Sequence, residues 1–148
     1  MSIDYEKIKN AIEKNNDIID FADFGNGVSA EWITKCEERI NLPLPESYKW
    51  WLMNYSGGEI NGEEIFSIYE QDFDSVVGGD LVYMYELNLK NFGFSKNMIP
   101  ICETDDDIYY FDSSISNEGE YPIYSFNNKC LYAENFCDFI IKRINANK

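Results

Sequence analysis

The chain has 148 residues and a formal net charge of −15, from 12 basic and 27 acidic side chains. This charge argues against DNA, RNA and anionic membranes as ligands, because binding to phosphate depends on lysine and arginine. The sequence contains no histidine, which excludes nucleophile activation by a Ser–His or Cys–His pair. Hydrophobic residues make up 45% of the chain and aromatic residues 16%, enough for the core of one domain over residues 1–148.

The sequence predicts no membrane span, export signal or metal site. No run approaches the roughly 18 apolar residues of a transmembrane helix, and residues 1–10 lack the basic and apolar blocks of a signal peptide. We therefore expect the protein in the cytoplasm. No phosphate-binding glycine motif is present, so no cofactor is expected. The cysteines lie in apolar runs without Cys-x-x-Cys spacing, which favours buried thiols over disulfides or zinc; they are Cys36, Cys102, Cys130 and Cys137.

The first elements predicted in chain order are two helices. Apolar residues at helical spacing, with Asp4 as the N-cap, predict a helix over about residues 4–15. Residues 17–27 are expected to form a loop with some extended structure. Ser29 is predicted to cap a second helix, which Pro43 closes.

A third predicted helix has a definite start and end. Pro45 suits its first turn, and Gly57 or Gly58 is expected to supply the positive-φ residue that ends it. Trp50 points about 100° away from its neighbour Trp51, so it is either a residue at the edge of the core or an exposed anchor. Between Pro45 and the glycine pair lies an apolar stripe at helical spacing, formed by Tyr48, Trp51, Leu52 and Tyr55.

The second half of the chain predicts strands and a closing helix. Asn61-Gly62, between short apolar runs, is typical of a two-residue hairpin, and residues 71–80 are expected to form an acidic surface loop. Residues 81–92 predict either a buried helix capped by Asp80 or two short strands, and the helix is favoured. A final helix is expected to follow Asn135. Strands are predicted at residues 98–102, 108–111, 122–126 and 130–132.

This order of elements favours the α+β class over alternating α/β. We expect a single domain in which a mainly antiparallel (mixed) sheet packs against N-terminal helices and a C-terminal helix.

The motifs in these elements resemble those of the SUKH superfamily (Smi/Knr-like domains) over roughly residues 29–142. The matching residues in the first half are Glu37, Ile40, Leu42, Pro45, Tyr48, Trp51, Leu52, Tyr55, Gly57 and Gly58. Those in the second half are Ile99-Pro-Ile101, Asp107, Tyr109, Phe111, Asp112, Pro122-Ile-Tyr124, Phe136 and Phe139. The chain has Ser56 where many relatives have an asparagine, and residues 81–94 match no element of the pattern. The resemblance implies a SUKH-like fold.

The resemblance to the SUKH superfamily also implies a function. Bacterial members of this superfamily are largely immunity proteins, which bind a cognate polymorphic toxin, often a nuclease, and neutralise it without chemistry of their own. Fungal relatives regulate cell-wall signalling.

Two acidic groups are candidates for a partner-binding surface. The segment from Glu103 to Asp107 is the densest, and its successive carboxylates repel one another. It is interpreted as a solvated turn, a partner-binding surface or, although it lacks the EF-hand pattern, a metal site. The second group lies around the predicted hairpin and the loop after it, where Tyr69 is either a core residue or a hot-spot residue. Its acidic residues are Glu59, Glu63, Glu64, Asp72 and Asp74.

We therefore expect a non-catalytic, acidic binding protein. The resemblance favours a cytoplasmic immunity protein whose partner is a basic toxin domain, with no nucleic acid and no membrane as ligand. The alternatives are a scaffold or regulatory protein for an endogenous partner, an enzyme using carboxylates, and acidity that serves only solubility. The expected partner-binding residues are Glu59, Glu103, Asp105, Asp106 and Asp107 for electrostatic attraction, with Trp50 and Tyr69 as anchors.

Overall fold

The structure is a computed structural model that describes residues 3–22, 24–69, 73–74, 78–91 and 93–148. Its sheet has seven strands in the order β1-β2-β3-β4-β5-β6-β7, and each neighbouring pair of strands is antiparallel. A single parallel bridge joins Ser67 to Asp80 outside these strands in the described part. The predicted α+β class is thus confirmed.

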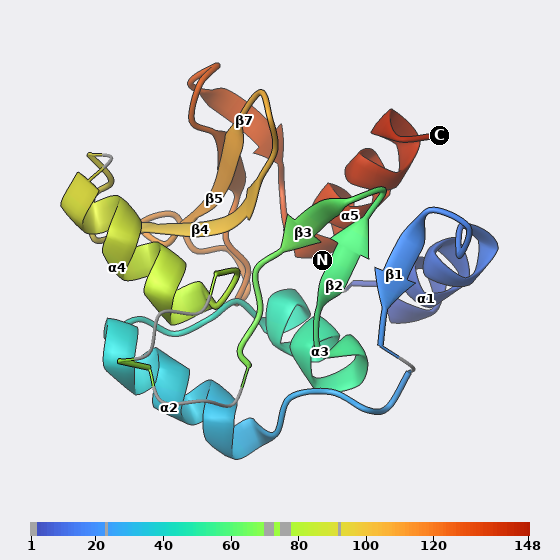
Figure 1. Cartoon of the computed structure of the whole chain (residues 1–148), viewed down its shortest axis with the longest axis horizontal. Coiled ribbons are helices and arrows are strands. Elements are labelled where there is room, and N and C mark those ends of the chain that lie inside the picture. Colours follow the sequence, from blue (N-terminus) through green and yellow to red (C-terminus); the bar gives the residue numbers. More distant parts are fainter. Residues whose placement is uncertain (1–2, 23, 70–72, 75–77, 92) are drawn as a thin grey trace.

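Helices cover the sheet on more than one side (Figure 1). The helices α3 and α5 lie behind β2 and β3, whereas α4 packs against β4 and contacts α2. No helix of the described part is long and apolar enough to cross a membrane. The helices are α1 (Tyr5–Lys14), α2 (Ala30–Ile40), α3 (Glu46–Tyr55), α4 (Leu81–Asn91) and α5 (Phe136–Ala146). The strands are β1 (Ile19–Phe21), β2 (Gly58–Ile60), β3 (Glu63–Ile65), β4 (Met98–Glu103), β5 (Ile108–Asp112), β6 (Ile123–Ser125) and β7 (Cys130–Ala133).

The predicted N-caps are present. The side chains of Asp4, Ser29 and Asn135 each accept a hydrogen bond from a backbone N–H in the first turn of α1, α2 and α5. Asp80 accepts a bond from the backbone N–H of Tyr83 at 3.2 Å, and residues 81–91 are helical. The helix was therefore the correct alternative for this segment.

Both ends of α3 differ from the prediction. Pro45 is the N-cap residue, with extended backbone angles, and does not lie in the first turn. Ser56, with a φ of +68°, ends the helix in place of Gly57 or Gly58. Gly58 is needed for another reason, because a Cβ at this position would lie 2.0 Å from the carbonyl oxygen of Asp20. The glycine therefore allows β1 and β2 to approach each other.

The core lies between the sheet and the helices α3 and α5. The six residues predicted to share it are confirmed as buried: Trp51, Leu52, Tyr55, Phe111, Phe139 and Ile140. Tyr48 packs edge-on against Phe136, with ring centroids 5.0 Å apart, and its hydroxyl donates to the Phe66 carbonyl at 2.5 Å. Within the described part, the indole N–H of Trp51 has no hydrogen-bond partner, so this side chain stabilises the fold through packing alone.

The cysteines divide into two groups. Cys36, Cys102 and Cys137 are buried, as predicted. Burial raises the pKa of Cys102 and Cys137 to about 12, so these thiols are protonated at neutral pH. The prediction is wrong for Cys130, which is exposed because it begins β7, the last strand of the sheet.

Replacing Trp51 with alanine should lower the free energy of unfolding by about 3–5 kcal/mol, because it leaves a cavity in the core. Met53, on the same helix, is 46% exposed, so Met53→Ala is the matched control and should change stability little. Urea unfolding followed by circular dichroism measures both. Equal effects of the two substitutions would contradict the proposed packing.

Candidate functional site

A row of carboxylates crosses the first three strands of the sheet. Asp20 of β1 lies opposite Glu59 of β2, and Glu59 lies opposite Glu64 of β3. Directly opposite residues project from the same face of a sheet with their Cβ atoms about 5 Å apart, and like charges at such positions are destabilising. Among the described residues, neither Asp20 nor Glu59 forms an ion pair. The row therefore costs stability in the isolated protein.

The strand register extends the row to β4. Ile65 of β3 pairs with Cys102 of β4 in antiparallel register, which places Glu64 and Glu103 at the next opposing position. Glu103 is exposed at the end of β4, where the chain enters the turn to β5. Four adjacent strands therefore each contribute one carboxylate to this acidic strip.

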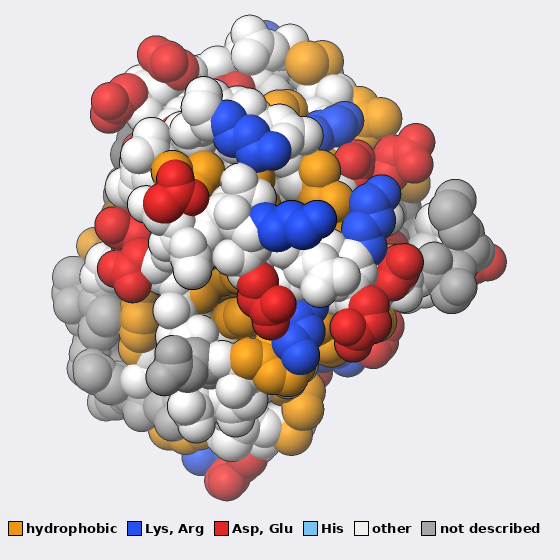
Figure 2. Space-filling model, turned by 90° about the vertical axis from the view of Figure 1, so that its right-hand side faces the viewer, with side chains coloured by type: hydrophobic (Ala, Val, Ile, Leu, Met, Phe, Trp, Pro, Cys, Tyr) orange, Lys and Arg blue, Asp and Glu red, His pale blue; other side chains and the backbone are white. Residues whose placement is uncertain are grey.

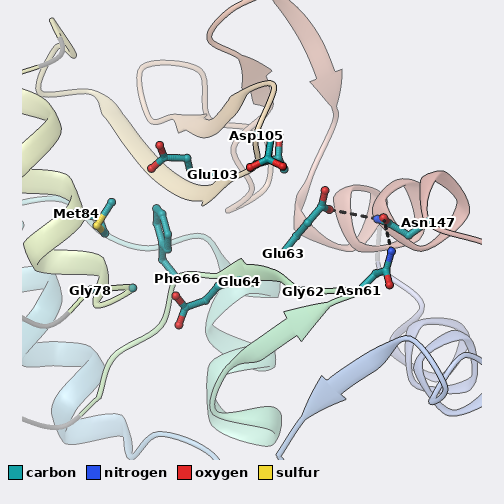
Figure 3. A pocket seen from close by; sticks show the side chains of 12 residues that line it. Asn61, Gly62, Glu63, Glu64, Phe66, Gly78, Met84, Glu103, Asp105 and Asn147 are labelled. Carbon is teal, nitrogen blue, oxygen red and sulfur yellow. Dashed lines mark hydrogen bonds between the residues drawn. The ribbon is translucent and has the colours of Figure 1, made fainter.

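A groove of about 770 Å³ lies along the strip (Figure 3). Its charged lining consists of Glu63, Glu64, Glu103 and Asp105, and no lysine or arginine of the described part lines it. By contrast, the face that carries α1, β1 and the C-terminus mixes basic with acidic side chains (Figure 2). The other lining residues are Asn61, Gly62, Phe66, Gly78, Gly79, Met84, Thr104 and Asn147.

Glu63 is the carboxylate of the groove that the protein itself neutralises. It points toward α5 (Figure 3), where the guanidinium of Arg143 binds it at 2.5 Å and the side-chain amide of Asn147 donates to it at 3.2 Å. Arg143 also donates to the Tyr109 hydroxyl at 3.3 Å. Glu63 thus anchors the β2–β3 hairpin to α5, and its charge is largely compensated.

Glu64 points to the opposite face of the hairpin and accepts a hydrogen bond from the Tyr69 hydroxyl at 2.5 Å. Burial and this bond raise the pKa of Tyr69 well above its usual value, so the phenol remains a donor. A Cβ on Gly79, whose φ is +87°, would lie 2.5 Å from the Glu64 carboxylate. Glycine at this position therefore makes room for the charge. Tyr69, predicted as an anchor, holds Glu64 in place.

The floor of the groove is apolar. Phe66 is 4% exposed and lies between Glu64 and Glu103, with Met84 of α4 beside it (Figure 3). Such a floor can accept the methylene stem of a lysine or arginine whose charged end reaches a carboxylate. Within the described residues, no group of three acidic or thiol side chains is arranged to hold a metal ion.

Asp107 does not belong to the exposed acidic surface, and this corrects the prediction. It is 5% exposed and accepts bonds from the backbone N–H groups of Ile108 at 2.8 Å and Asn127 at 2.9 Å. The hydroxyl of Ser125 also donates to it. Asp107 therefore ties the β4–β5 turn to the β6–β7 turn and cannot act as a steering charge.

The other residues predicted to bind a partner lie in different parts of the structure. Glu103 and Asp105 line the groove, and Asp106 is exposed on the same turn without lining it. Trp50 lies elsewhere: its ring stacks on Tyr5 of α1 at 4.5 Å. Glu59 belongs to the carboxylate row.

The sequence did not predict a binding role for several residues that line the groove, among them Phe66, Met84 and Asn147. The local signal of a close approach there was Gly79, beside the Glu64 carboxylate. Asp72, from the second acidic group, lies outside the described residues, and Asp74 pairs with Arg39 at 2.9 Å.

Together these features define a small α+β domain with a seven-stranded antiparallel meander and an acidic groove beside its β2–β3 hairpin. The family model SUKH_5, described as "SMI1-KNR4 cell-wall", matches residues 8–145. The chain belongs to this family. The match begins in α1, ends in α5 and includes α4, a segment that motif resemblance alone did not place.

Glu59→Gln should stabilise the isolated protein by about 0.2–1 kcal/mol, because it removes a charge that lies between those of Asp20 and Glu64. The gain should shrink at high salt, which screens exposed charges. Urea unfolding at low and high ionic strength measures it. A loss of stability at low salt would show that the row is not repulsive.

Asp107→Ala should destabilise the domain by more than about 2 kcal/mol, because it leaves several buried donors without an acceptor. The neighbouring exposed side chain provides the control, and Asp106→Ala should stay within about 0.5 kcal/mol of the wild type. Thermal and urea unfolding of both variants test this difference, and a harmless Asp107→Ala would refute the tethering role.

Proposed function

We propose that the protein is a non-catalytic immunity protein that binds the basic toxic domain of a cognate polymorphic toxin in the cytoplasm and neutralises it. The observation that carries this proposal is the groove, whose charged lining is four carboxylates with no cation in the described part. The row through Glu59 and Asp20 extends the negative surface beyond the groove. Membership of the SMI1-KNR4 family is compatible with the same function, because the superfamily that the sequence motifs resemble includes bacterial immunity proteins.

The physical basis is electrostatic attraction to a protein that binds phosphate. Toxins of this kind are often nucleases, and a nuclease needs lysine and arginine to hold its substrate. An acidic groove presents negative charge in place of nucleic-acid phosphates, which speeds encounter and covers the substrate-binding surface. Relief of repulsion within the carboxylate row adds a favourable contribution when a basic surface binds.

The four carboxylates of the groove have two different roles. Glu63 and Glu64 are already held by Arg143 and Tyr69, so they provide fixed acceptors. Glu103 and Asp105 are exposed and form no ion pair within the described chain. These two carboxylates are therefore the ones most available to a partner's lysine or arginine.

A regulatory protein that binds an endogenous basic partner is the second candidate. The family description refers to the cell wall, and an acidic groove by itself does not distinguish a toxin from another basic protein. A neighbouring gene for a large toxin with a variable C-terminal domain, whose toxicity this protein suppresses on co-expression, would favour the immunity function. Binding to a basic housekeeping protein without such suppression would favour regulation.

Reversing one charge of the carboxylate row and two of the groove should slow association with the toxin domain by about 10-fold or more at low salt, because steering depends on the local field. The variant is Glu59→Lys, Glu103→Lys and Asp105→Lys, and stopped-flow mixing measures its on-rate. The matched control reverses three exposed acids near α1, namely Glu6→Lys, Glu13→Lys and Asp17→Lys.

Both variants change the net charge equally, so any difference between them reports the position of the binding face. We expect the control to reduce the on-rate much less, and the wild-type on-rate to fall steeply with salt. Equal slowing by the two variants, or full protection of cells by the groove variant, would place the binding face elsewhere.

A further inference from the structure

The face of the sheet that carries the acidic strip continues onto an apolar surface. Glu103 of β4 lies opposite Ile108 of β5, so both side chains project from the same face. Side chains alternate along a strand, which places Tyr110 on that face as well, whereas Tyr109 and Phe111 are buried on the core side. The acidic strip and the outer side of β5 therefore share one face of the sheet.

The apolar surface reaches across β6 to β7. Tyr110 lies opposite Tyr124 of β6, and Tyr124 lies opposite Leu131 of β7. The ring of Tyr110 stacks with that of Tyr124 at a centroid distance of 6.0 Å and meets the ring of Phe126 edge-on at 6.4 Å. Leu131 is 52% exposed, and the others are half-buried. We term this surface the aromatic platform, formed by Ile108, Tyr110, Tyr124, Phe126 and Leu131.

Hydrogen bonds join the platform to the acidic turn of the groove. The side-chain amide of Asn127, in the β6–β7 turn, donates to the Asp106 carbonyl at 2.6 Å, and its backbone N–H donates to the Asp107 carboxylate at 2.9 Å. Asp105 of the same acidic turn lines the groove. A molecule that binds in the groove is therefore next to a hairpin whose position is fixed relative to the groove.

Charge indicates what kind of molecule fits this combined surface. The segment from Tyr121 to Ala133, which contains β6 and β7, has no aspartate or glutamate and one lysine, whereas the adjoining groove is lined by four carboxylates. A second copy of the chain has a net charge of −15 and would be repelled by the groove. A basic protein with an apolar patch beside its positive surface complements both parts.

The groove alone is small for a specific interface. Twelve residues line it, whereas a standard protein–protein interface includes roughly 20–30 residues on each side. Charged contacts contribute mainly to the rate of encounter, and buried aromatic and apolar side chains contribute most of the binding energy. The platform supplies such side chains directly beside the charges.

We propose that the aromatic platform is the apolar half of the toxin-binding surface, on which Tyr124 and Leu131 anchor the basic toxin domain that the groove attracts. This inference rests on the proposed function and adds which residues hold the toxin after the first encounter. The anchors expected from the sequence are engaged within the protein, Trp50 by stacking and Tyr69 by its bond to Glu64. The carboxylates then set the association rate, and the platform sets the dissociation rate.

Dissociation kinetics test this proposal, with the basic toxin domain that the protein neutralises on co-expression as the probe. Tyr124→Ala combined with Leu131→Ala should raise the off-rate by about 10-fold or more, because truncated anchors cost affinity on this scale. The on-rate should stay within about 2-fold of the wild type, because no charge changes. Leu131→Ala alone changes an exposed side chain and should raise the off-rate by about 3-fold or more.

The matched control is Phe24→Ala combined with Met53→Ala. It also removes one aromatic and one aliphatic side chain, which are 47% and 46% exposed and lie outside the platform. We expect this variant to dissociate at the wild-type rate. Urea unfolding checks that both double variants are folded, and if Tyr124→Ala prevents folding, Leu131→Ala alone decides.

The outcomes separate this inference from the proposed function. If no basic toxin domain binds the wild type, the proposed function fails and the inference fails with it. If the charge-reversal variant slows association but the platform variants keep the wild-type off-rate, the platform is overturned and the proposed function stands. An equal rise in the off-rate of the control also overturns the inference, because the lost contacts would then not be specific to the platform.

Discussion

The register of the antiparallel sheet is the constraint on which the rest of the structure depends. Because side chains alternate between faces, one register for each strand pair decides which residues meet the core and which meet solvent. The register that buries Ile60, Ile65 and Cys102 also places Glu59, Glu64 and Glu103 in one strip on the opposite face. The acidic surface is therefore a direct consequence of how the core is packed.

Local features hold this register in place. Asn61 and Gly62 both have positive φ, as a two-residue hairpin requires, and Gly58 allows β1 to approach β2. The ion pair between Glu63 and Arg143 fixes the hairpin to α5, while buried Asp107 joins the two turns at the other end of the sheet. The protein can carry repelling carboxylates on its surface because these internal contacts stabilise the strands that present them.

Much of the fold could be predicted because its signals are local. Caps, the aromatic stripe of α3 and the Asn61-Gly62 hairpin each depend on residues a few positions apart. The groove could not be predicted in the same way, because α4 separates β3 from β4 along the chain and their pairing is non-local. The burial of Asp107 was missed for a similar reason: its donors include Ser125 and Asn127, from a distant turn, and the local sequence shows only a run of acids.

Hydrogen exchange of the protein alone and bound to the basic toxin domain that the proposed function assigns as its partner is the most direct test of the central claim. We predict that binding protects backbone amides in residues 58–65 and 103–106, which form the strip and the groove, and leaves α1 unchanged. Protection confined to α1 or α3, with the β2–β3 hairpin exchanging as it does in the free protein, would contradict the claim that the acidic groove is the binding surface.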